Sequence, residues 1–400
     1  MTSRSNRPNA GTKRLREDAP TTEAEVPLKR RNKDLSANVK IYALSKTTGK
    51  IESSTRLSSE WESFTDFEDF IVISEAVCLD KKLYVVGGLN TRSVKSYLPE
   101  TNEWSQISSM GKGRNGFGLC HNDGMILAIG GWGFSMEAYG MTAVAFKSTE
   151  LFDPSVNKWS YMKEMTRPRA YVATVSCGDF VYALGGSDGG ERLNCVEKFN
   201  PNSRRHGGWK VVKGNMLQAR DSHRAVAVGR RIFVLGGVGG HREALASGEV
   251  FDVLTETFAE ITDLMKVPRF RFGVAVNGSE IYCIGGCTGF DKKEFAEVEG
   301  VKDGEKGGEI GGVIKGDKGS KKRGFKTAAK RGVKRGVKRG VKRGVKRGVK
   351  GDVKKGNIKK EDYRKELNSV EIFDIDTLTW KEGCNAITPS GENIYFALPF

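Results

Sequence analysis

The residues of this chain that are best suited to binding chemistry are arginines that recur at a common spacing. They stand in the segments MGKGRNGFG, MTRPRAYVA, MLQARDSHR and VPRFRFGVA, and they are Arg114, Arg169, Arg220, Arg269 and Arg271. A guanidinium group carries a permanent charge and a planar fork of N–H donors, which suits bidentate binding of carboxylates. If these segments take equivalent places in a symmetric fold, the arginines form a ring that can bind an acidic peptide. The alternative is that each one pairs with a carboxylate of its own loop or lies along the surface.

The elements that must position these arginines recur along the chain as well. Short apolar segments that each end in two glycines are LYVVGG (83–88), ILAIGG (126–131), VYALGG (181–186), IFVLGG (232–237) and IYCIGG (281–286). They follow one another at intervals of 43 to 55 residues, which is typical of an array of similar modules. A strand that is apolar at almost every position is expected to be buried on both faces. The glycines permit positive φ or close backbone approach at its end.

A second strand follows each pair of glycines and carries an aromatic residue, a polar turn and a tryptophan. Examples are SYLPETNEW (96–104), ELFDPSVNKW (150–159) and EIFDIDTLTW (371–380), and Phe258 takes the place of the tryptophan in one unit. Turn formers separate the strands, and the indole can pack between modules. The units resemble Kelch repeats, each of which forms one four-stranded blade of a β-propeller. The resemblance runs from about residue 38 to the C-terminus, with one long interruption.

The two ends of the chain each carry half of a unit. Residues 38–56 predict two strands around a turn at 47–49, and residues 386–400 predict the other half, with Leu398 and Pro399 where two glycines are expected. Neither half can bury its face alone. We therefore expect an all-β, six-bladed Kelch-type β-propeller closed by pairing of the N- and C-terminal segments. The five complete blades are expected near 71–107, 116–161, 170–212, 222–261 and 272–286 with 367–382.

The formal charge of +17 is concentrated in two segments outside the repeats. Residues 291–366 contain 27 Lys and Arg and 12 Asp and Glu, and residues 1–37 contain nine and five. Both are polar and poor in apolar residues, which predicts disorder. We expect a disordered basic tail at 1–37, a first part of the propeller at 38–290, a disordered Lys/Arg/Gly-rich insertion in blade five at 291–366, and a closing part of the propeller at 367–400.

The basic segments suggest functions of their own. Lys29, Arg30, Arg31 and Lys33 form a candidate nuclear-import signal, for which the alternative is a solvated tail. Residues 321–360 can act as a polyelectrolyte arm that binds nucleic acid without sequence preference, or can be a tandem repeat without a role. No apolar run approaches the roughly 20 residues of a membrane helix. We expect a cytoplasmic or nuclear location, or both, and no membrane contact.

The sequence offers little support for catalysis. Seven scattered cysteines are typical of reduced intracellular thiols. The four histidines, His121, His206, His223 and His241, show no metal-ligand spacing, and no nucleophile or phosphate-binding motif is present. A propeller enzyme is therefore the least favoured class, and we predict no catalytic residue, metal or cofactor.

The resemblance implies a protein-interaction module. The arginines resemble the substrate-facing arginines of Kelch-like adaptors, and Trp132, Ser187, Asp188 and Arg242 lie in loops that follow glycine pairs and are candidates for the same face. The family implies recognition of ubiquitin-ligase substrates or of actin structures. Residues 1–70 are too short for the BTB and BACK domains of such adaptors. We therefore expect that the chain binds its targets alone, that another subunit connects it to cullin-ligase components, or that the sequence is a partial product. The alternative is a nuclear or nucleic-acid-associated scaffold that acts through its basic arms.

Overall fold

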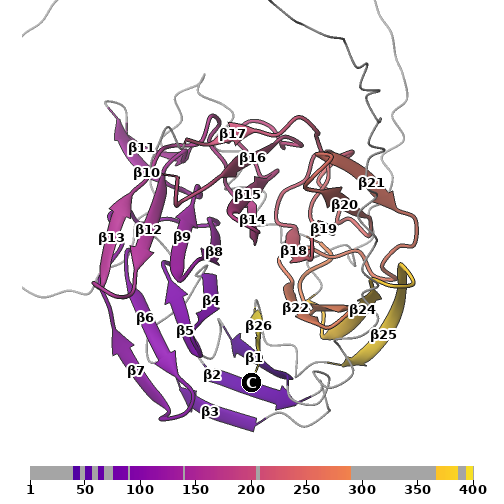
Figure 1. Cartoon of the computed structure of the whole chain (residues 1–400), viewed down its shortest axis with the longest axis horizontal. Helices are drawn as coiled ribbons and strands as arrows, with labels where there is room; N and C mark the ends of the chain where they lie inside the picture. The colour runs from indigo at the N-terminus through magenta and orange to yellow at the C-terminus, as the bar shows by residue number, and fades with distance from the viewer. Residues whose placement is uncertain are drawn as a thin grey trace, which may run out of the picture.

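The computed structural model describes residues 39–45, 50–55, 62–66, 75–88, 91–137, 140–203, 208–289, 366–385 and 393–399. Every regular element in these ranges is a β-strand, and four-stranded antiparallel sheets follow one another around a central axis (Figure 1). The predicted all-β propeller is confirmed. The expectations for residues 1–37, including the candidate import signal, and for the insertion at 291–365 lie outside the described residues.

Five sheets are the blades expected from the repeat units. Blade 1 comprises β4 (Glu75–Leu79), β5 (Lys82–Val86), β6 (Val94–Leu98) and β7 (Glu103–Gln106). Blade 2 comprises β8 (Gly118–Asn122), β9 (Met125–Ile129), β12 (Thr149–Asp153) and β13 (Lys158–Tyr161). Blade 3 comprises β14 (Ala173–Cys177), β15 (Phe180–Leu184), β16 (Val196–Phe199) and β17 (Lys210–Val211).

The two remaining repeat blades follow the same order. Blade 4 comprises β18 (Arg224–Val228), β19 (Arg231–Leu235), β20 (Gly248–Asp252) and β21 (Thr257–Ile261). Blade 5 comprises β22 (Gly273–Asn277), β23 (Glu280–Ile284), β24 (Ser369–Asp374) and β25 (Thr379–Asn385). Blade 5 therefore pairs strands from both sides of the long insertion, as the repeat pattern predicts.

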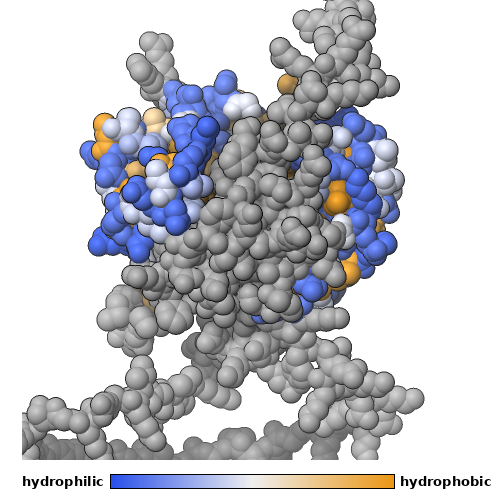
Figure 2. Space-filling view, turned by 90° about the horizontal axis from the view of Figure 1, so that it is seen from below, coloured by the Kyte–Doolittle hydropathy of each residue, from blue (hydrophilic) through white to orange (hydrophobic). Residues whose placement is uncertain are grey.

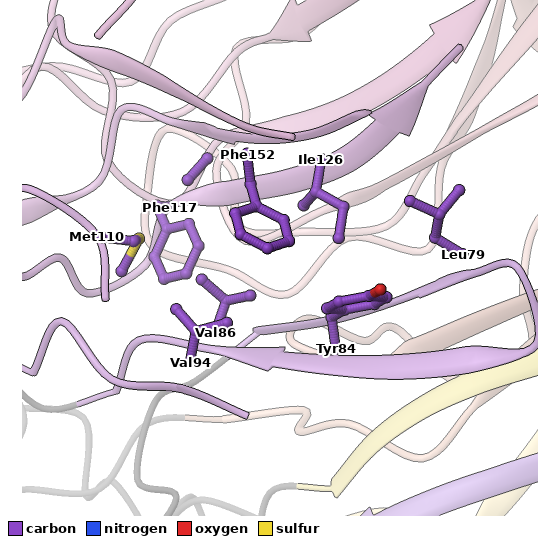
Figure 3. Packing of buried hydrophobic residues seen from close by; sticks show 9 residues of the cluster. Leu79, Tyr84, Val86, Val94, Met110, Phe117, Ile126 and Phe152 are labelled. Atoms are coloured by element: carbon purple, nitrogen blue, oxygen red, sulfur yellow. The ribbon is translucent and has the colours of Figure 1, made fainter. Parts of the chain in front are cut away.

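The hydrophobic core lies between neighbouring blades. Side chains of blade 1, such as Tyr84 and Val86, pack against Ile126 and Phe152 of blade 2 (Figure 3). Because both faces of each second strand meet a neighbouring sheet, these strands are apolar at successive positions rather than at alternate ones. The continuous apolar runs of the sequence are thus explained by packing between sheets.

The aromatic residues of the third and fourth strands form cross-strand pairs. Phe152 lies opposite Trp159 with ring centroids 5.2 Å apart. In blade 4, Phe251 and Phe258 are 4.7 Å apart at the equivalent register. The phenylalanine at position 258 therefore makes the same aromatic contact as the tryptophans of the other units, as the sequence comparison predicted.

A further four-stranded sheet contains both terminal segments. Its order is β26 (Asn393–Pro399), β1 (Val39–Ser45), β2 (Lys50–Thr55) and β3 (Glu62–Asp66). β26 pairs antiparallel with β1, with Tyr42 opposite Phe396, so the expected pairing of the two segments is present. β26 also contacts β22 and β4, the innermost strands of blades 5 and 1. Figure 1 shows this sheet between those two blades.

The division of this sheet between the termini differs from the prediction of two strands from each end. The N-terminal segment supplies three strands and the C-terminal segment supplies the innermost strand. β3 was not predicted. Because β26 is an innermost strand, it does not correspond to a strand that ends in two glycines. The segment IYALSK (41–46) is the counterpart of VYALGG (181–186), so the comparison of Leu398 and Pro399 with a glycine pair was wrong.

Blade 2 carries an additional element where a loop was expected. Strands β10 (Trp132–Glu137) and β11 (Gly140–Ala145) form a two-stranded antiparallel hairpin in which Phe134 is opposite Ala143. The sequence analysis placed Trp132 in a loop and did not predict the hairpin, although the residues MTAVA of its second arm include β-branched types that favour strands. Figure 1 shows the hairpin at the periphery of the ring near β12 and β13.

The visible surface of the described blades is mostly hydrophilic, with isolated hydrophobic residues (Figure 2). Phe134, Leu217 and Leu254 are among the exposed apolar side chains, and apolar residues scattered singly are normal at protein surfaces. Within the described ranges, no helix has the length and apolar character that crossing a lipid bilayer demands.

Candidate functional site at the axial ring

Four of the predicted binding arginines are buried inside the blades. Arg114, Arg169, Arg220 and Arg269 have 0% exposed surface. Each pairs with a glutamate of the third strand of its own blade, in the pairs Arg114–Glu150 (2.7 Å), Arg169–Glu197 (3.0 Å), Arg220–Glu249 (2.7 Å) and Arg269–Glu371 (2.6 Å). The prediction that these four line a partner-binding face is therefore wrong. They pair with internal carboxylates, and these lie on strands rather than in loops.

The contacts of Arg220 explain why an arginine is required at this place. Its Nη1 donates to the carbonyl oxygens of Gly236 (2.8 Å) and Ser247 (3.1 Å), and its Nη2 donates to Glu249 Oε1 (2.7 Å). The carboxylate of Glu249 also accepts the backbone N–H groups of Leu217 and Gln218. The pair thus connects the incoming loop, the end of the second strand and the start of the third strand. Buried charges need such partners, since an unpaired one is very costly.

The same arrangement recurs in blades 2, 3 and 5. The arginine Nη1 donates to the first glycine of the pair, Gly130, Gly185 or Gly285, at 2.7 to 2.9 Å. Glu150, Glu197 and Glu371 each accept two backbone N–H groups from the incoming loop. We call these four pairs the arginine–glutamate frame. These pairs connect the strands and the incoming loop within each of blades 2 to 5.

A sequence signal for the frame was present and was missed. The glutamate stands two residues before the aromatic residue of the third strand in the segments TELFD, VEKF, GEVFD and VEIFD. Blade 1 has Lys95 at that position, in VKSYL. Residues 67–74, which directly precede the first strand of this blade, contain no arginine. Because the unit that lacks the arginine also lacks the glutamate, comparison of the units would have revealed an internal ion pair.

A ring about the axis is formed by the residues that lie two positions after each buried arginine. Gly116, Tyr171, Ser222 and Arg271 have φ angles of 52°, 53°, 54° and 53°. Tyr171 N donates to Gly116 O (2.5 Å), Ser222 N to Tyr171 O (2.9 Å) and Arg271 N to Ser222 O (3.0 Å). We call these four residues the axial ring. The predicted common position exists, but it lies two residues further along each unit than expected.

The side chains of the axial ring combine an aromatic ring, a hydroxyl and a guanidinium group. Tyr171, Ser222 and Arg271 are each half-buried. The guanidinium carbon of Arg271 lies 5.6 Å from the centre of the Tyr171 ring, a distance at which a cation is attracted to an aromatic face. Gly116 provides the space that the Tyr171 ring occupies, since a methyl group at Gly116 would lie 2.7 Å from Tyr171 Cδ1.

Loops that follow the glycine pairs border this ring. Trp132 exchanges two backbone hydrogen bonds with Asn115, and Ser187 exchanges two with Ala170. A methyl group at Gly116 would also lie 3.4 Å from Trp132 Cδ1. Of the predicted binding residues, Arg271 thus belongs to the axial ring, and Trp132 and Ser187 pair with residues directly next to Gly116 and Tyr171 of the ring.

Two predicted residues have contacts in turns instead. The carboxylate of Asp188 accepts a hydrogen bond from Arg167 Nη2 (2.5 Å) and further hydrogen bonds from the backbone N–H groups of Gly190 and Glu191. Asp188 therefore stabilises the loop in which it lies. Arg242 has a φ of 62°, and its N–H donates to Gly239 O. These contacts place both residues in turns, and neither is part of the axial ring.

Charged side chains of both signs lie next to the axial ring. Arg192 Nε lies 2.6 Å from Asp221 Oδ2. Burial raises the pKa of Asp221, and the positive charges of Arg192 and Arg271 oppose this shift. Within the axial ring the positive charge is carried by the guanidinium of Arg271, which also acts on Asp221. The site therefore offers a half-buried positive charge beside aromatic surface, which suits a carboxylate on a peptide.

His223 is a buried histidine directly behind the axial ring. It stands three residues after Arg220, where the other units have Phe117, Val172 and Phe272, and it is 1% exposed. Burial, together with the positive charges of Arg220, Arg224 and Arg169, holds the pKa of His223 well below its usual 6.5. The imidazole is therefore neutral in the folded protein and occupies an apolar position of the repeat.

We expect acid to destabilise the protein through His223. In the unfolded chain its pKa is about 6.5, so below that pH the unfolded state binds a proton that the folded state does not, at a cost approaching about 1.4 kcal/mol per pH unit. Phenylalanine stands at two of the equivalent positions in the other units. Replacement of His223 by phenylalanine removes the histidine and with it this loss of stability in acid. Urea unfolding of the parent and His223→Phe at pH 7 and pH 5 measures it. Equal losses of stability in the two proteins would contradict the prediction.

The thiols of Cys120 and Cys283 lie in environments that disfavour reactivity. The described cysteines form no disulfide bond, and they are Cys78, Cys120, Cys177, Cys195, Cys283 and Cys287. Burial raises the pKa of Cys120 and of Cys283 to about 12, and the thiol rather than the thiolate is then present at neutral pH. Within the described ranges, no cluster of three or more His, Cys, Asp or Glu side chains is placed to hold a metal ion.

Comparisons with known proteins agree with this geometry. A family model described as the KLHDC2/KLHL20/DRC7 Kelch-repeats domain matches residues 74–286. The chain is 27% identical over 221 residues to Kelch-like protein 25 of Xenopus tropicalis, covering 54% of this chain and 36% of that protein. It is 24% identical over 257 residues to Kelch-like protein terF of Aspergillus terreus, covering 60% and 55%.

A third relative is alpha-scruin of Limulus polyphemus, which is 23% identical over 206 residues, covering 49% of this chain and 22% of that protein. The chain thus matches between about a fifth and just over half of the length of these relatives.

Proposed function

Because the chain belongs to the Kelch-repeat family that this model describes, we propose that it is a protein-interaction module whose axial ring binds an acidic segment of a partner protein. The observation that carries the proposal is the ring of Gly116, Tyr171, Ser222 and Arg271, which gathers one residue from each of four blades at the same backbone geometry. A binding surface is built in this way from loops on a rigid scaffold.

The chemistry of the ring supports an acidic peptide as the ligand. Arg271 supplies donors for a carboxylate, and Tyr171 and Trp132 supply flat apolar surface beside it. Arginine and aromatic residues dominate the energetics of protein interfaces. Backbone hydrogen bonds between blades join the ring residues. The backbone of the ring is therefore in place before a ligand arrives, which lowers the entropic cost of binding.

We expect Arg271→Ala and Tyr171→Ala each to weaken capture of the partner by about tenfold or more, as hot-spot residues at the centre of an interface do. Affinity capture with quantitative mass spectrometry measures the loss. Arg231→Ala is the control, because Arg231 is an exposed arginine at the start of β19. Retention of the same partners by both ring variants would refute the site. Capture of ubiquitin-ligase components would support an adaptor role, and capture of actin-associated proteins a cytoskeletal one.

The basic segments provide the alternative, a nuclear or nucleic-acid-associated scaffold. The charge of residues 291–366 favours it, since polyelectrolyte binding weakens steeply with salt. Capture at two salt concentrations, with the intact chain and with a deletion of residues 300–360, separates the two functions. Partners that depend on the insertion are lost at high salt and on deletion, whereas partners of the axial ring respond to Arg271→Ala.

We also propose that the sheet of β26, β1, β2 and β3 closes the propeller as a sixth blade. Its position against β4 and β22 supports this. Deletion of residues 393–400 is then expected to lower the free energy of unfolding by several kcal/mol, because it exposes the inner faces of two blades. Deletion of residues 300–360 is the control and should cost at most about 1 kcal/mol, since loop length changes stability slowly. Equal thermal midpoints for the parent and the 393–400 deletion would contradict closure.

A further inference from the structure

We propose that Arg224, inside the cavity on the propeller axis, is a second carboxylate-binding residue, and that Glu75 is its internal partner until an acidic side chain of a bound peptide replaces Glu75. The inference rests on the proposed function of the axial ring and extends it along the axis. It assigns to the partner two acidic groups, one for Arg271 and one for Arg224.

The axial cavity is bounded by the innermost strands of all five repeat blades. Its lining is largely small and apolar, and it includes Ala76, Ala173, Ala225 and Ala275. Among the lining residues that the structure describes, Glu75 and Arg224 carry the formal charges, while burial lowers the pKa of His121. An ion pair in such surroundings is the polar feature with which an entering ligand can exchange contacts.

Glu75 and Arg224 reach each other across the axis. Glu75 is the first residue of β4 and Arg224 is the first residue of β18, and Figure 1 shows these strands on opposite sides of the central space. Arg224 Nη1 lies 3.5 Å from Glu75 Oε2, and the two side chains are 27% and 19% exposed. The pairs of the arginine–glutamate frame are shorter, at 2.6 to 3.0 Å, and at most 3% exposed. The cross-axis pair is therefore longer and more accessible to water than any pair of the frame.

The guanidinium of Arg224 is also fixed from a neighbouring blade. Its Nε donates to the carbonyl oxygen of Phe272 at 2.7 Å, so one edge of the group is held while Nη1 faces Glu75. A guanidinium that is held in this way loses little rotamer entropy when it binds a carboxylate. The position of the group does not depend on Glu75 alone.

The axial ring lies directly next to this pair along the chain. Ser222 of the ring is two residues before Arg224, which limits the separation of their Cα atoms to about 7 Å. An acidic side chain that enters past Arg271 thus encounters the guanidinium of Arg224. Exchange of the Glu75 carboxylate for the incoming one keeps Arg224 paired, which avoids leaving a poorly solvated charge without a partner.

The test uses the full-length chain and the capped dipeptide acetyl-Glu-Glu-amide as the probe. Its dissociation constant is measured from the backbone amide shifts of Ser222 and Arg271, which report on the axis and not on the basic insertion. We expect Glu75→Gln to tighten binding about tenfold and Arg224→Gln to weaken it about tenfold, in line with the coupling of close charge pairs. The double variant should behave as Arg224→Gln does. Glu260→Gln and Arg231→Gln, both at exposed positions, are matched controls that should leave the constant unchanged.

The Glu75→Gln result decides the inference, because a gain of affinity does not arise from misfolding. An unchanged constant in Glu75→Gln overturns the role of the cross-axis pair. If Arg271→Ala still weakens binding in that case, the axial ring remains the site and only the second contact is lost. If Arg271→Ala also leaves the constant unchanged, the proposed function fails as well.

Discussion

Replacement of Glu197 with alanine is expected to lower the free energy of unfolding by about 3–5 kcal/mol, which is the usual effect of removing one partner of a buried ion pair. Arg169 and Glu197 are both 0% exposed. Glu197 also accepts the backbone N–H groups of Thr166 and Arg167. The variant therefore leaves a buried guanidinium without a counter-charge and two loop donors without an acceptor. Urea unfolding at neutral pH, followed by circular dichroism, measures the change.

Two further variants separate the loss of the charge pair from a general effect of mutation. Glu191→Ala changes an exposed glutamate of the same blade and should alter stability by less than about 0.5 kcal/mol. The double variant Arg169→Met with Glu197→Leu should recover part of the loss, since apolar replacement of a whole buried pair is often tolerated. A loss below about 1 kcal/mol in Glu197→Ala would show that the frame contributes little to stability.

Replacement of Gly237 with alanine is the second substitution with a large expected effect. Gly237 ends the apolar strand of blade 4 with a φ of 100°, and non-glycine residues in such sparsely populated regions cost about 1–3 kcal/mol. A methyl group there would also lie 2.6 Å from His223 Cβ and 2.7 Å from Asp221 O. Because both obstacles belong to the backbone or to the first side-chain atom, they cannot move independently, and overpacking adds about 1–3 kcal/mol. We expect a combined loss of about 3–5 kcal/mol.

The control for this variant is Gly229→Ala in the same blade. Gly229 has a φ of 59°, and a methyl group there would meet no atom within 4 Å. The left-handed conformation alone costs roughly 1–2 kcal/mol for a residue with a Cβ atom. The stabilities of the two variants should therefore differ by roughly 1–4 kcal/mol, which thermal unfolding detects as a difference of several degrees between the midpoints. Equal midpoints would mean that the crowding around Gly237 relaxes at little cost, and would contradict the prediction.

The structure assigns different positions to arginines that look alike in the sequence. Arg269 and Arg271 stand two residues apart in VPRFRFGVA, yet Arg269 is 0% exposed and belongs to the frame, whereas Arg271 is half-buried and belongs to the axial ring. The positive φ of Arg271 turns the chain between them. A substitution at Arg269 is therefore expected to act on stability, and one at Arg271 on binding.

The strand order of the repeat blades followed from the sequence by itself. A run such as VYALGG is apolar at every position because both faces of the strand are covered, and this pattern of burial is local information. The turn residues and the tryptophans were equally local, and Trp159 and Phe258 occupy the expected places. Because the same pattern recurs in five units, each unit supports the prediction of strands in the others.

The tertiary structure decides the direction of the arginines, and the sequence indicates it only through the joint absence of the arginine and the glutamate in blade 1. Whether Arg220 faces a partner or Glu249 depends on where the third strand of the blade places its carboxylate, 29 residues away along the chain. The axial ring depends on hydrogen bonds between blades, such as that from Ser222 N to Tyr171 O. The cross-axis contact of Glu75 and Arg224 joins blades 1 and 4. Contacts between residues of different blades arise when the blades pack around a common axis. The spacing of residues within one unit does not predict them.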